Sequence, residues 1–267
     1  MHAKHKIRTM LKITRNLEYY RDLILVLTQK ELKVRYKNST LGYLWSIANP
    51  LAFAFVFFIV FGLIMKVQKE QYVLFLLTGL FPWQWFSNSV NVSPMLLFGN
   101  ASIVKKLNFP KEIIPLATVL NDTLHFILSI PVIILFFPIY NKIPSFYWIW
   151  EIPLLLIAQF LMIYGISLIV SSVNLFLRDL ERLVNIMVTV LFYFTPIVYS
   201  ETMIPIQYRY LIYFNPLATL MINWRNVLLN GQLDIKLLAI TLIYGGIIFV
   251  AGHLVYKKLS LRFAEVL

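Results

Sequence analysis

The stretch from Glu31 to Pro50 reads ELKVRYKNSTLGYLWSIANP and changes from a basic, polar approach into a long apolar run. Lys33, Arg35 and Lys37 precede the segment from Leu44 to Met65, which carries no charged residue. A charge-free segment of about 20 residues is long enough to cross a bilayer as a helix. Because basic residues beside a membrane helix favour the cytoplasmic side, the stretch predicts a first membrane helix that starts in the cytoplasm.

The composition of the whole chain predicts several such helices. Of its 267 residues, 60% are hydrophobic and only 13% are charged, and the mean hydropathy is +0.75. These values lie outside the range of soluble domains and predict an all-α integral membrane protein. The net charge of +12 does not indicate nucleic-acid binding, because the basic residues are scattered at the ends of apolar runs. The chain has no cysteine, which excludes disulfides, thiol catalysis and cysteine-ligated metals.

The chain divides into a cytoplasmic N-terminal segment, residues 1–43, and one transmembrane domain, residues 44–267. The N-terminal segment is too charged to be a cleaved signal peptide. Its apolar residues recur at helical spacing: Leu17, Tyr20, Ile24 and Leu27. This pattern predicts an amphipathic helix from Leu17 to about Lys37 that lies along the cytoplasmic membrane surface. A solvated helix that packs on a partner protein is the alternative.

Six apolar segments are predicted to cross the membrane: about residues 44–65, 72–92, 113–138, 147–177, 183–199 and 235–256. Pro82 predicts a kink or a break in the second segment. Before the last segment, residues 204–229 form two apolar pieces separated by Asn215 and Pro216, each too short to cross alone. We expect a re-entrant hairpin of two half-helices on the outer side.

The placement of basic residues orients this arrangement. With both termini in the cytoplasm, all but six of the 24 Lys and Arg residues lie on the cytoplasmic side, as such residues prefer. The six on the outer side are Lys66, Lys69, Lys142, Arg209, Arg225 and Lys236. A seventh full span through residues 206–228 would move Lys257, Lys258 and Arg262 outside, which the same preference disfavours.

No nucleotide-binding loop of the form G-x-x-x-x-G-K-[ST] occurs in the chain. Such a loop cradles nucleotide phosphates with its backbone N–H groups, so we expect no nucleotide site here. The four histidines are also scattered: His2, His5, His125 and His253. Because no cluster of acid–base or metal-binding residues stands out, we expect no metal site. An integral-membrane glycosyltransferase or acyltransferase is a less favoured function.

Several short stretches resemble one family of membrane proteins. Around the first membrane helix they are Arg35, Tyr36, Ser39, Leu41, Gly42, Leu44, Trp45 and Pro50. Further on they are Leu76–Trp85 (LLTGLFPWQW), Asn108–Pro115 (NFPKEIIP), Arg178 with Asp179, Phe192–Tyr199 (FYFTPIVY) and Asn215–Pro216. Together, in this order and at this chain length, they resemble the permease subunits of ABC-2 type exporters. The branch in question moves O-antigen, capsular polysaccharide and teichoic acid.

The resemblance implies a permease that passes a lipid-linked polysaccharide across a prokaryotic inner membrane. It also implies a homodimer of this chain that works with a dimer of P-loop ATPase subunits, which would hold ATP and Mg²⁺. Membrane lipid is the remaining expected partner. An ABC-2 exporter of a small drug or lipid is the alternative within transport.

The cytoplasmic segment NASIVKKLNFPK, residues 100–111, is the candidate for contact with the ATPase. A short helix is expected over eight residues: Ala101, Ser102, Ile103, Val104, Lys105, Lys106, Leu107 and Asn108. Pro110 would stop this helix. Its mixture of apolar and basic side chains suits a cleft on a partner. The alternative is a basic loop that fixes topology and touches only lipid headgroups.

Aromatic residues make up 16% of the chain and could line a path for sugar rings. By position the candidates are Tyr43, Trp45, Phe53, Phe57, Trp83, Tyr193 and Tyr199. Sugar rings pack their C–H faces on such surfaces, and the resemblance implies a channel lined in this way. Aromatic residues are also enriched at bilayer interfaces and in helix contacts, which remains the alternative for each of them.

Two charged pairs have open roles. Arg178 and Asp179, at the inner end of the fourth span, could form a switching ion pair or could cap helix ends and anchor the turn. Asp122 and His125 lie deeper in a span and should face protein or water rather than lipid. Being three residues apart they share a helix face and could pair. Transport and packing are both open roles for them.

Overall fold

A computed structural model describes residues 18–33, 42, 44–64, 71–106 and 109–267. In this part of the chain every regular element is helical, as the composition predicts. Residues 18–33 form the first helix described. The elements that follow are α2 (Leu44–Phe57), η1 (Phe58–Ile64), α3 (Tyr72–Val92), η2 (Ser93–Met95), α4 (Leu96–Gly99), α5 (Ala101–Lys106), α6 (Ile113–Phe136), η3 (Pro138–Tyr140), α7 (Trp148–Asn174), α8 (Leu180–Phe194), η4 (Glu201–Met203), η5 (Ile206–Phe214), α9 (Pro216–Asn230), α10 (Ile235–Ser260) and α11 (Phe263–Val266).

Three of the described helices are long and apolar enough to cross a membrane: Ile113–Tyr140, Trp148–Asn174 and Ile235–Ser260. Helix α3 has the bounds predicted for the second span, but polar residues such as Gln84, Asn88 and Asn91 lower its hydropathy. Helices α2 and α8 are shorter, and η1 continues α2 as a π-helix. The fold is thus that of an all-helical membrane protein, and the number of six spans stays a prediction.

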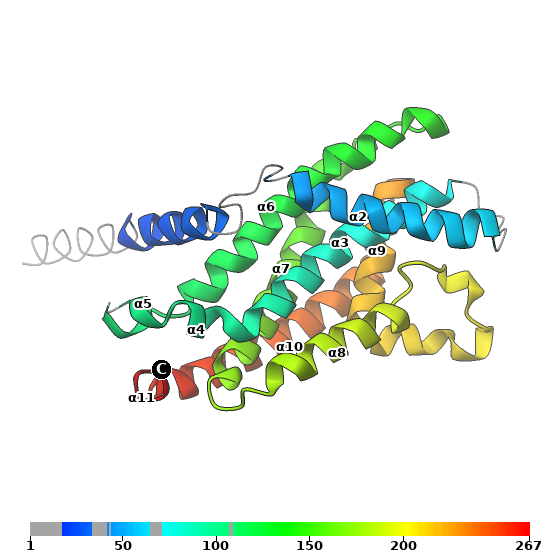
Figure 1. Ribbon diagram of the computed structural model, residues 1–267. Coiled ribbons are helices and arrows are strands. Elements are labelled where there is room, and N and C mark those ends of the chain that lie inside the picture. The colour runs from blue at the N-terminus through cyan, green and yellow to red at the C-terminus, as the bar shows by residue number, and fades with distance from the viewer. Residues whose placement is uncertain (1–17, 34–41, 43, 65–70, 107–108) are drawn as a thin grey trace, which may run out of the picture.

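Helix α3 occupies the centre of the bundle and packs on α2, α6, α7, α8 and α9 (Figure 1). Its helix runs unbroken through Pro82, so the break considered there does not occur. A proline removes one backbone N–H, and dense packing on all sides holds the helix across that gap. Gln159 of α7 donates its Nε2 to the Pro82 carbonyl at 2.8 Å, and its Oε1 accepts from Trp224 Nε1 of α9 at 2.6 Å. One buried amide therefore joins three helices.

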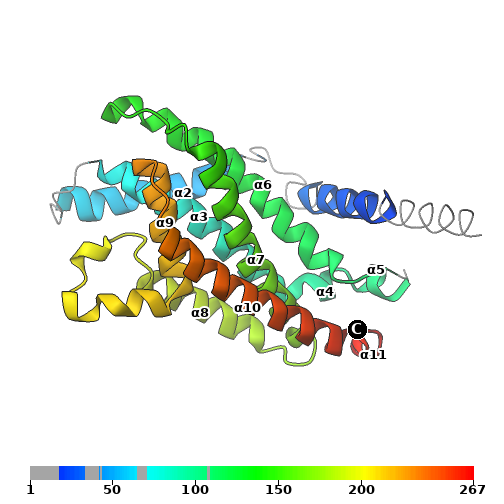
Figure 2. The same cartoon turned by 180° about the vertical axis from the view of Figure 1, so that it is seen from behind.

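Helices α7 and α10 form the most extensive helix pair and lie side by side in Figure 2. Their backbones approach closely at Gly165 and Gly252. A Cβ atom on Gly165 would lie 2.7 Å from the Cα of Phe249, and one on Gly252 would collide with the Gly165 carbonyl oxygen. Small residues at such crossings let membrane helices approach, which explains the glycines.

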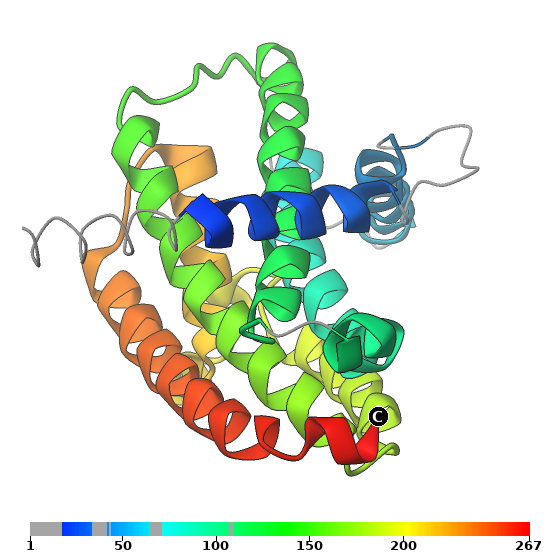
Figure 3. The same cartoon turned by 90° about the vertical axis from the view of Figure 1, so that its left-hand side faces the viewer.

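The two ends of the bundle differ in what they carry. Residues 18–33, α4, α5 and α11 gather at one end, and η5 lies at the other (Figures 1 and 3). At the first end, Leu27, Val104, Phe109 and Phe263 belong to one buried apolar cluster. Residues 18–33 are helical, as predicted, and Leu27 is buried, but Tyr20 of the predicted apolar stripe is exposed. The placement of this helix along a membrane surface stays a prediction.

The segment 204–229 consists of two pieces, as expected, but they differ in kind. The first is the 3₁₀-helix η5, none of whose residues is buried, and the second is the largely buried α9. The break falls at Asn215, whose Oδ1 accepts from the backbone N–H of Leu217 at 3.0 Å, with Pro216 at the first helical position. An Asn cap followed by proline is a strong helix start, so the sequence marks this break well.

Candidate functional site

Helices α2, α3 and α8 surround a cleft of about 300 Å³. Its lining joins rings with amides and hydroxyls: Phe53, Phe57, Leu80, Trp83, Gln84, Ser87, Asn91, Val188, Thr189, Phe192 and Tyr193. Phe192 is the centre of the aromatic part, with its ring centroid 6.0 Å from Phe57, 5.6 Å from Trp83 and 5.4 Å from Tyr193. Residues from three separate segments therefore build one aromatic surface.

Four of the predicted aromatic residues meet in this cleft: Phe53, Phe57, Trp83 and Tyr193. Trp45 lies exposed at the start of α2 and is not part of the lining. Tyr199 follows α8, and its hydroxyl donates to the carbonyl oxygen of Tyr193 at 3.1 Å. Tyr43 lies outside the described residues. The sequence reasoning did not single out Phe192, although it stands beside Tyr193 in an aromatic run.

One wall of the cleft is polar and uncharged. Gln84, Ser87 and Asn91 are three and four residues apart on α3, so they share one helix face. The Nδ2 of Asn91 donates to Ser87 Oγ at 3.3 Å, while its Oδ1 is buried without a hydrogen-bond partner. On the opposite wall, Thr189 donates to the Asn185 carbonyl of its own helix at 2.9 Å. The polar face of α3 can exchange hydrogen bonds with a ligand, and the sequence analysis did not predict it.

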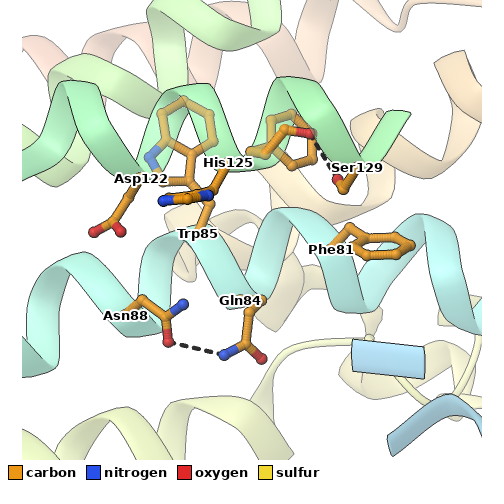
Figure 4. Close-up of a pocket in the computed structure, with 8 residues that line it drawn as sticks. Phe81, Gln84, Trp85, Asn88, Asp122, His125 and Ser129 are labelled. Carbon is orange, nitrogen blue, oxygen red and sulfur yellow. Dashed lines mark hydrogen bonds between the residues drawn. The ribbon is translucent and has the colours of Figure 1, made fainter. Parts of the chain in front are cut away.

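A smaller pocket, about 20 Å³, lies between α3 and α6 and contains the polar pair Asp122 and His125 (Figure 4). Both side chains are buried, which confirms that they face protein. Asp122 Oδ2 accepts from Ser89 Oγ of α3 at 2.7 Å. Figure 4 shows the pair on α6 facing Trp85 and Asn88 of α3. A space of this size holds about one water molecule, so it cannot admit a sugar.

The surface around α5 carries the basic residues of the predicted contact helix. Lys105 and Lys106 are exposed, and so is Ser102. Val104 points the other way into the buried cluster at this end, while Ala101 and Ile103 are half-buried. Leu107 and Asn108 lie outside the described residues. The described helix therefore has an apolar inner face and a basic outer face.

Two neighbours brace α5. Lys30 of the first helix donates its Nζ to Asn100 Oδ1, just before α5 begins. On the far side, α11 packs on α5, and the Nζ of Lys111 lies 5.8 Å from the ring centroid of Phe263 in α11. A force applied at α5 would thus reach both the N-terminal helix and the end of α10.

The turn between α7 and α8 holds Arg178 and Asp179. The Arg178 guanidinium lies 5.6 Å from the ring centroid of Phe98 in α4, and Asp179 precedes α8 without a capping side-chain hydrogen bond. Arg178 also borders a pocket of about 320 Å³. The stacked guanidinium ties this turn to the α4 end of the bundle.

Comparison with known proteins decides the family. The model of the ABC-2 type transporter family matches residues 22–229. The chain belongs to that family. An ABC-2 chain of this kind is a membrane transport subunit and is not itself an enzyme, which agrees with the missing nucleotide-binding loop.

Named relatives match from 77% to 96% of the ABC-2 chain. It is 48% identical over 257 residues to an O-antigen export system permease protein RfbA of Klebsiella pneumoniae, covering 96% of this chain and 99% of the relative. It is 28% identical to the protein of that name from Myxococcus xanthus, covering 84% of this chain and 86% of the relative. It is 26% identical to the polysialic acid transport protein KpsM of Escherichia coli, covering 77% of this chain and 80% of the relative.

The ABC-2 chain also holds a buried cation that sequence reasoning placed outside the membrane as a topology marker. The guanidinium of Arg225 in α9 donates to the carbonyl oxygens of Pro196 at 2.9 Å and Ile197 at 2.7 Å. Its centre lies 3.7 Å from the ring centroid of Phe75 in α3. Gly79 provides the space that the guanidinium occupies, because a Cβ at this position would lie 2.8 Å from Nη2. No local pattern in the sequence could have indicated this.

The far end of α9 is fixed by side chains from the α6–α7 connection and the start of α7. Lys142 Nζ donates to the Leu229 carbonyl at 2.6 Å, and Trp148 Nε1 donates to the Val227 carbonyl at 2.9 Å. The Leu229 carbonyl lies in the last turn, where a helix end lacks intrahelical donors, and the Val227 carbonyl also accepts from the Gly231 N–H at 2.9 Å. Glu151, in the first turn of α7, is buried, and its Oε1 accepts from the Leu233 N–H at 3.1 Å. Helix α9 is thus anchored at both ends.

Proposed function

We propose that this chain is the permease subunit of an ABC exporter that moves a lipid-linked, O-antigen-like polysaccharide across the bacterial inner membrane. The observation that carries the proposal is the aromatic and polar cleft between α2, α3 and α8. It occurs in a chain whose relatives, over almost the full length, are O-antigen export permeases. A channel for sugars needs flat apolar surfaces and hydrogen-bonding groups side by side, and this cleft offers both.

In the proposed route, sugar rings slide over Phe53, Phe57, Trp83, Phe192 and Tyr193. A surface of rings holds each sugar weakly through many contacts, so no single site traps the polymer. The polar face of α3 exchanges hydrogen bonds as hydroxyl groups pass. The remaining predicted aromatic residues, Tyr43, Trp45 and Tyr199, would extend the path toward its ends.

The proposed topology has six spans, both termini in the cytoplasm and residues 204–229 as a re-entrant hairpin at the outer mouth. The grouping of residues 18–33, α5 and α11 at one end of the bundle supports a shared side for the two termini. Residues 1–43 would form the cytoplasmic segment and residues 44–267 the transmembrane domain. Two copies of the chain would form the channel between them.

The energy source would be a separate pair of ATPase subunits that hold ATP and Mg²⁺. We assign their contact to residues 101–108, with Lys105 and Lys106 facing outward and Val104 holding the helix to the bundle. The link from Lys30 to Asn100 would carry the motion of α5 to the N-terminal helix. Arg178, stacked on Phe98, would anchor the neighbouring turn with Asp179 during this motion.

Affinity purification of the protein from its native membrane in mild detergent tests the proposal first. A stoichiometric P-loop subunit, identified by mass spectrometry, and ATP hydrolysis in the eluate are expected. Loss of surface polysaccharide in cells that lack this chain is the second expected result. Isolation of the chain alone, together with an unchanged cell surface in the deletion strain, would overturn the proposed function.

The contact surface is tested by the double substitution Lys105→Ala with Lys106→Ala. Polysaccharide export should fall while the protein level in the membrane is unchanged. Lys257→Ala with Lys258→Ala is the matched control, because it removes the same charge from exposed lysines at the end of α10. Equal export in both double variants would refute the coupling role of α5.

A further inference from the structure

We infer that the polymer passing through the cleft between α2, α3 and α8 is an uncharged, hydroxyl-rich glycan rather than a polyanion. The inference rests on the proposed function and narrows its substrate class. Among the described residues that line the cleft, none carries a formal charge.

The first argument is electrostatic. A carboxylate or phosphate that leaves water loses hydration, and that loss is recovered only if cations meet the anion inside. The chain has 24 Lys and Arg residues, but none of those that the structure describes lines the cleft. Arg225, the buried cation in α9, has its Nη1 and Nη2 on the carbonyls of Pro196 and Ile197. A polyanion would therefore find no described counter-charge along this surface.

The aromatic wall also favours an uncharged glycan over a polyanion. The face of an aromatic ring is the negative side of its quadrupole. That face attracts the weakly positive C–H groups of a sugar ring and repels a carboxylate or phosphate. Phe57, Trp83, Phe192 and Tyr193 all belong to the wall, so the preference is repeated along it.

The polar groups of the cleft favour a partner that can both donate and accept hydrogen bonds. A sugar hydroxyl both donates and accepts hydrogen bonds, whereas an ionised carboxylate only accepts them. Gln84 and Ser87, on the same face of α3, and Thr189 across the cleft add groups that can both donate and accept. The described cleft is matched to hydroxyl groups.

Chemical analysis of the surface polymer tests the inference. Polysaccharide is extracted from the native host and from a strain that lacks this gene, and the polymer lost on deletion is assayed for neutral sugars, uronic acids, sialic acids and phosphate. We expect neutral sugars and no acidic group in the repeating unit. A lost polymer with an acid in every repeat would overturn the inference and leave the proposed function intact. An unchanged cell surface would instead refute the proposed function.

A pair of isosteric variants tests the contact itself. In the full transporter, Thr189→Val removes a hydroxyl from the cleft. Thr123→Val on α6 removes a hydroxyl that makes the same kind of bond, to the Val119 carbonyl at 2.7 Å, away from the cleft. Export should fall on the order of fivefold in Thr189→Val, the size expected for one net hydrogen bond, and remain unchanged in Thr123→Val. Equal export in both variants, at equal protein levels, would overturn the role assigned to the Thr189 hydroxyl in the cleft.

Discussion

The Nη2 of Arg225 donates to the carbonyl oxygen of Ile197 at 2.7 Å, which ties α9 to the extended segment that follows α8. The neighbouring carbonyls are also bonded, Pro196 by Nη1 of the same guanidinium and Val198 by the Tyr72 hydroxyl at 3.2 Å. Three successive carbonyls of one segment are therefore held by α3 and α9. This segment leads from the cleft helix α8 to η5, so its position decides where η5 lies.

We predict that Arg225→Met lowers the free energy of unfolding by about 2–4 kcal/mol, because two buried carbonyls lose their donors. Thermal unfolding of the protein in detergent measures the change. Arg209→Met is the comparison, since Arg209 also donates to two carbonyls, those of Thr202 and Ile204, but in a more exposed setting. Its effect should be smaller, and a larger effect at Arg209 would refute the special role of Arg225.

Helix α10 offers a matched pair of glycines. Gly252→Ala should separate α7 from α10, because the new Cβ collides with the Gly165 carbonyl, and a loss of about 1–3 kcal/mol is expected. Gly246→Ala should be neutral or stabilise by up to about 1 kcal/mol, because nothing lies within 4 Å of its Cβ and alanine favours helix. Melting temperatures of the two variants that do not differ would contradict the close α7–α10 crossing.

The amide of Gln159 provides a test of the buried junction between α3, α7 and α9. Gln159→Leu leaves the Trp224 N–H without a partner and removes the side-chain bond to the Pro82 carbonyl, which keeps its bond within α3, so a loss of about 1–3 kcal/mol is expected. Trp224→Phe removes the indole donor and leaves the Pro82 bond in place. Denaturation of both variants is followed by fluorescence. Gln159→Leu should unfold at a lower denaturant concentration than Trp224→Phe, because it loses the bond to the Pro82 carbonyl as well. Equal midpoints would show that this bond adds no stability.

The aromatic wall is tested by two neighbours on α2. Phe53 lines the cleft, whereas Phe55 is exposed elsewhere on the helix. Phe53→Ala should reduce polysaccharide export several-fold, since one aromatic contact contributes about 0.5–1.5 kcal/mol. Phe55→Ala, which removes the same ring, should retain export. Surface polysaccharide measured against permease level separates transport from folding, and a defect confined to Phe55→Ala would place the path elsewhere.

Much of the helix plan was predictable because it depends on local properties. The predicted 72–92 span coincides with α3, and the predicted break at Asn215–Pro216 falls where α9 begins. The predicted fifth span, 183–199, was set too late, since α8 is Leu180–Phe194. The apolar sequence continues beyond the end of α8, so hydropathy alone extends the predicted span too far. The helix ends because the residue before Pro196 is disfavoured in a helical conformation.

The site was predictable only in part. Phe53, Phe57, Trp83 and Tyr193 were chosen from position and do meet in one cleft. The ring at its centre, Phe192, and the polar face of α3 were missed, because aromatic content alone does not say which face of a helix looks into a cavity. The roles predicted for Tyr43, Leu107 and Asn108 concern residues outside the described part of the chain.

The sequence by itself determined that the chain is an apolar helical membrane protein without a nucleotide-binding loop, because apolarity, helix length and motif are properties of contiguous residues. Only the tertiary structure decided that Phe57, Trp83 and Phe192 form one surface, and that Arg225 is buried against Phe75 instead of facing water. These contacts join segments far apart in the chain. They depend on how whole helices pack, which no local pattern encodes.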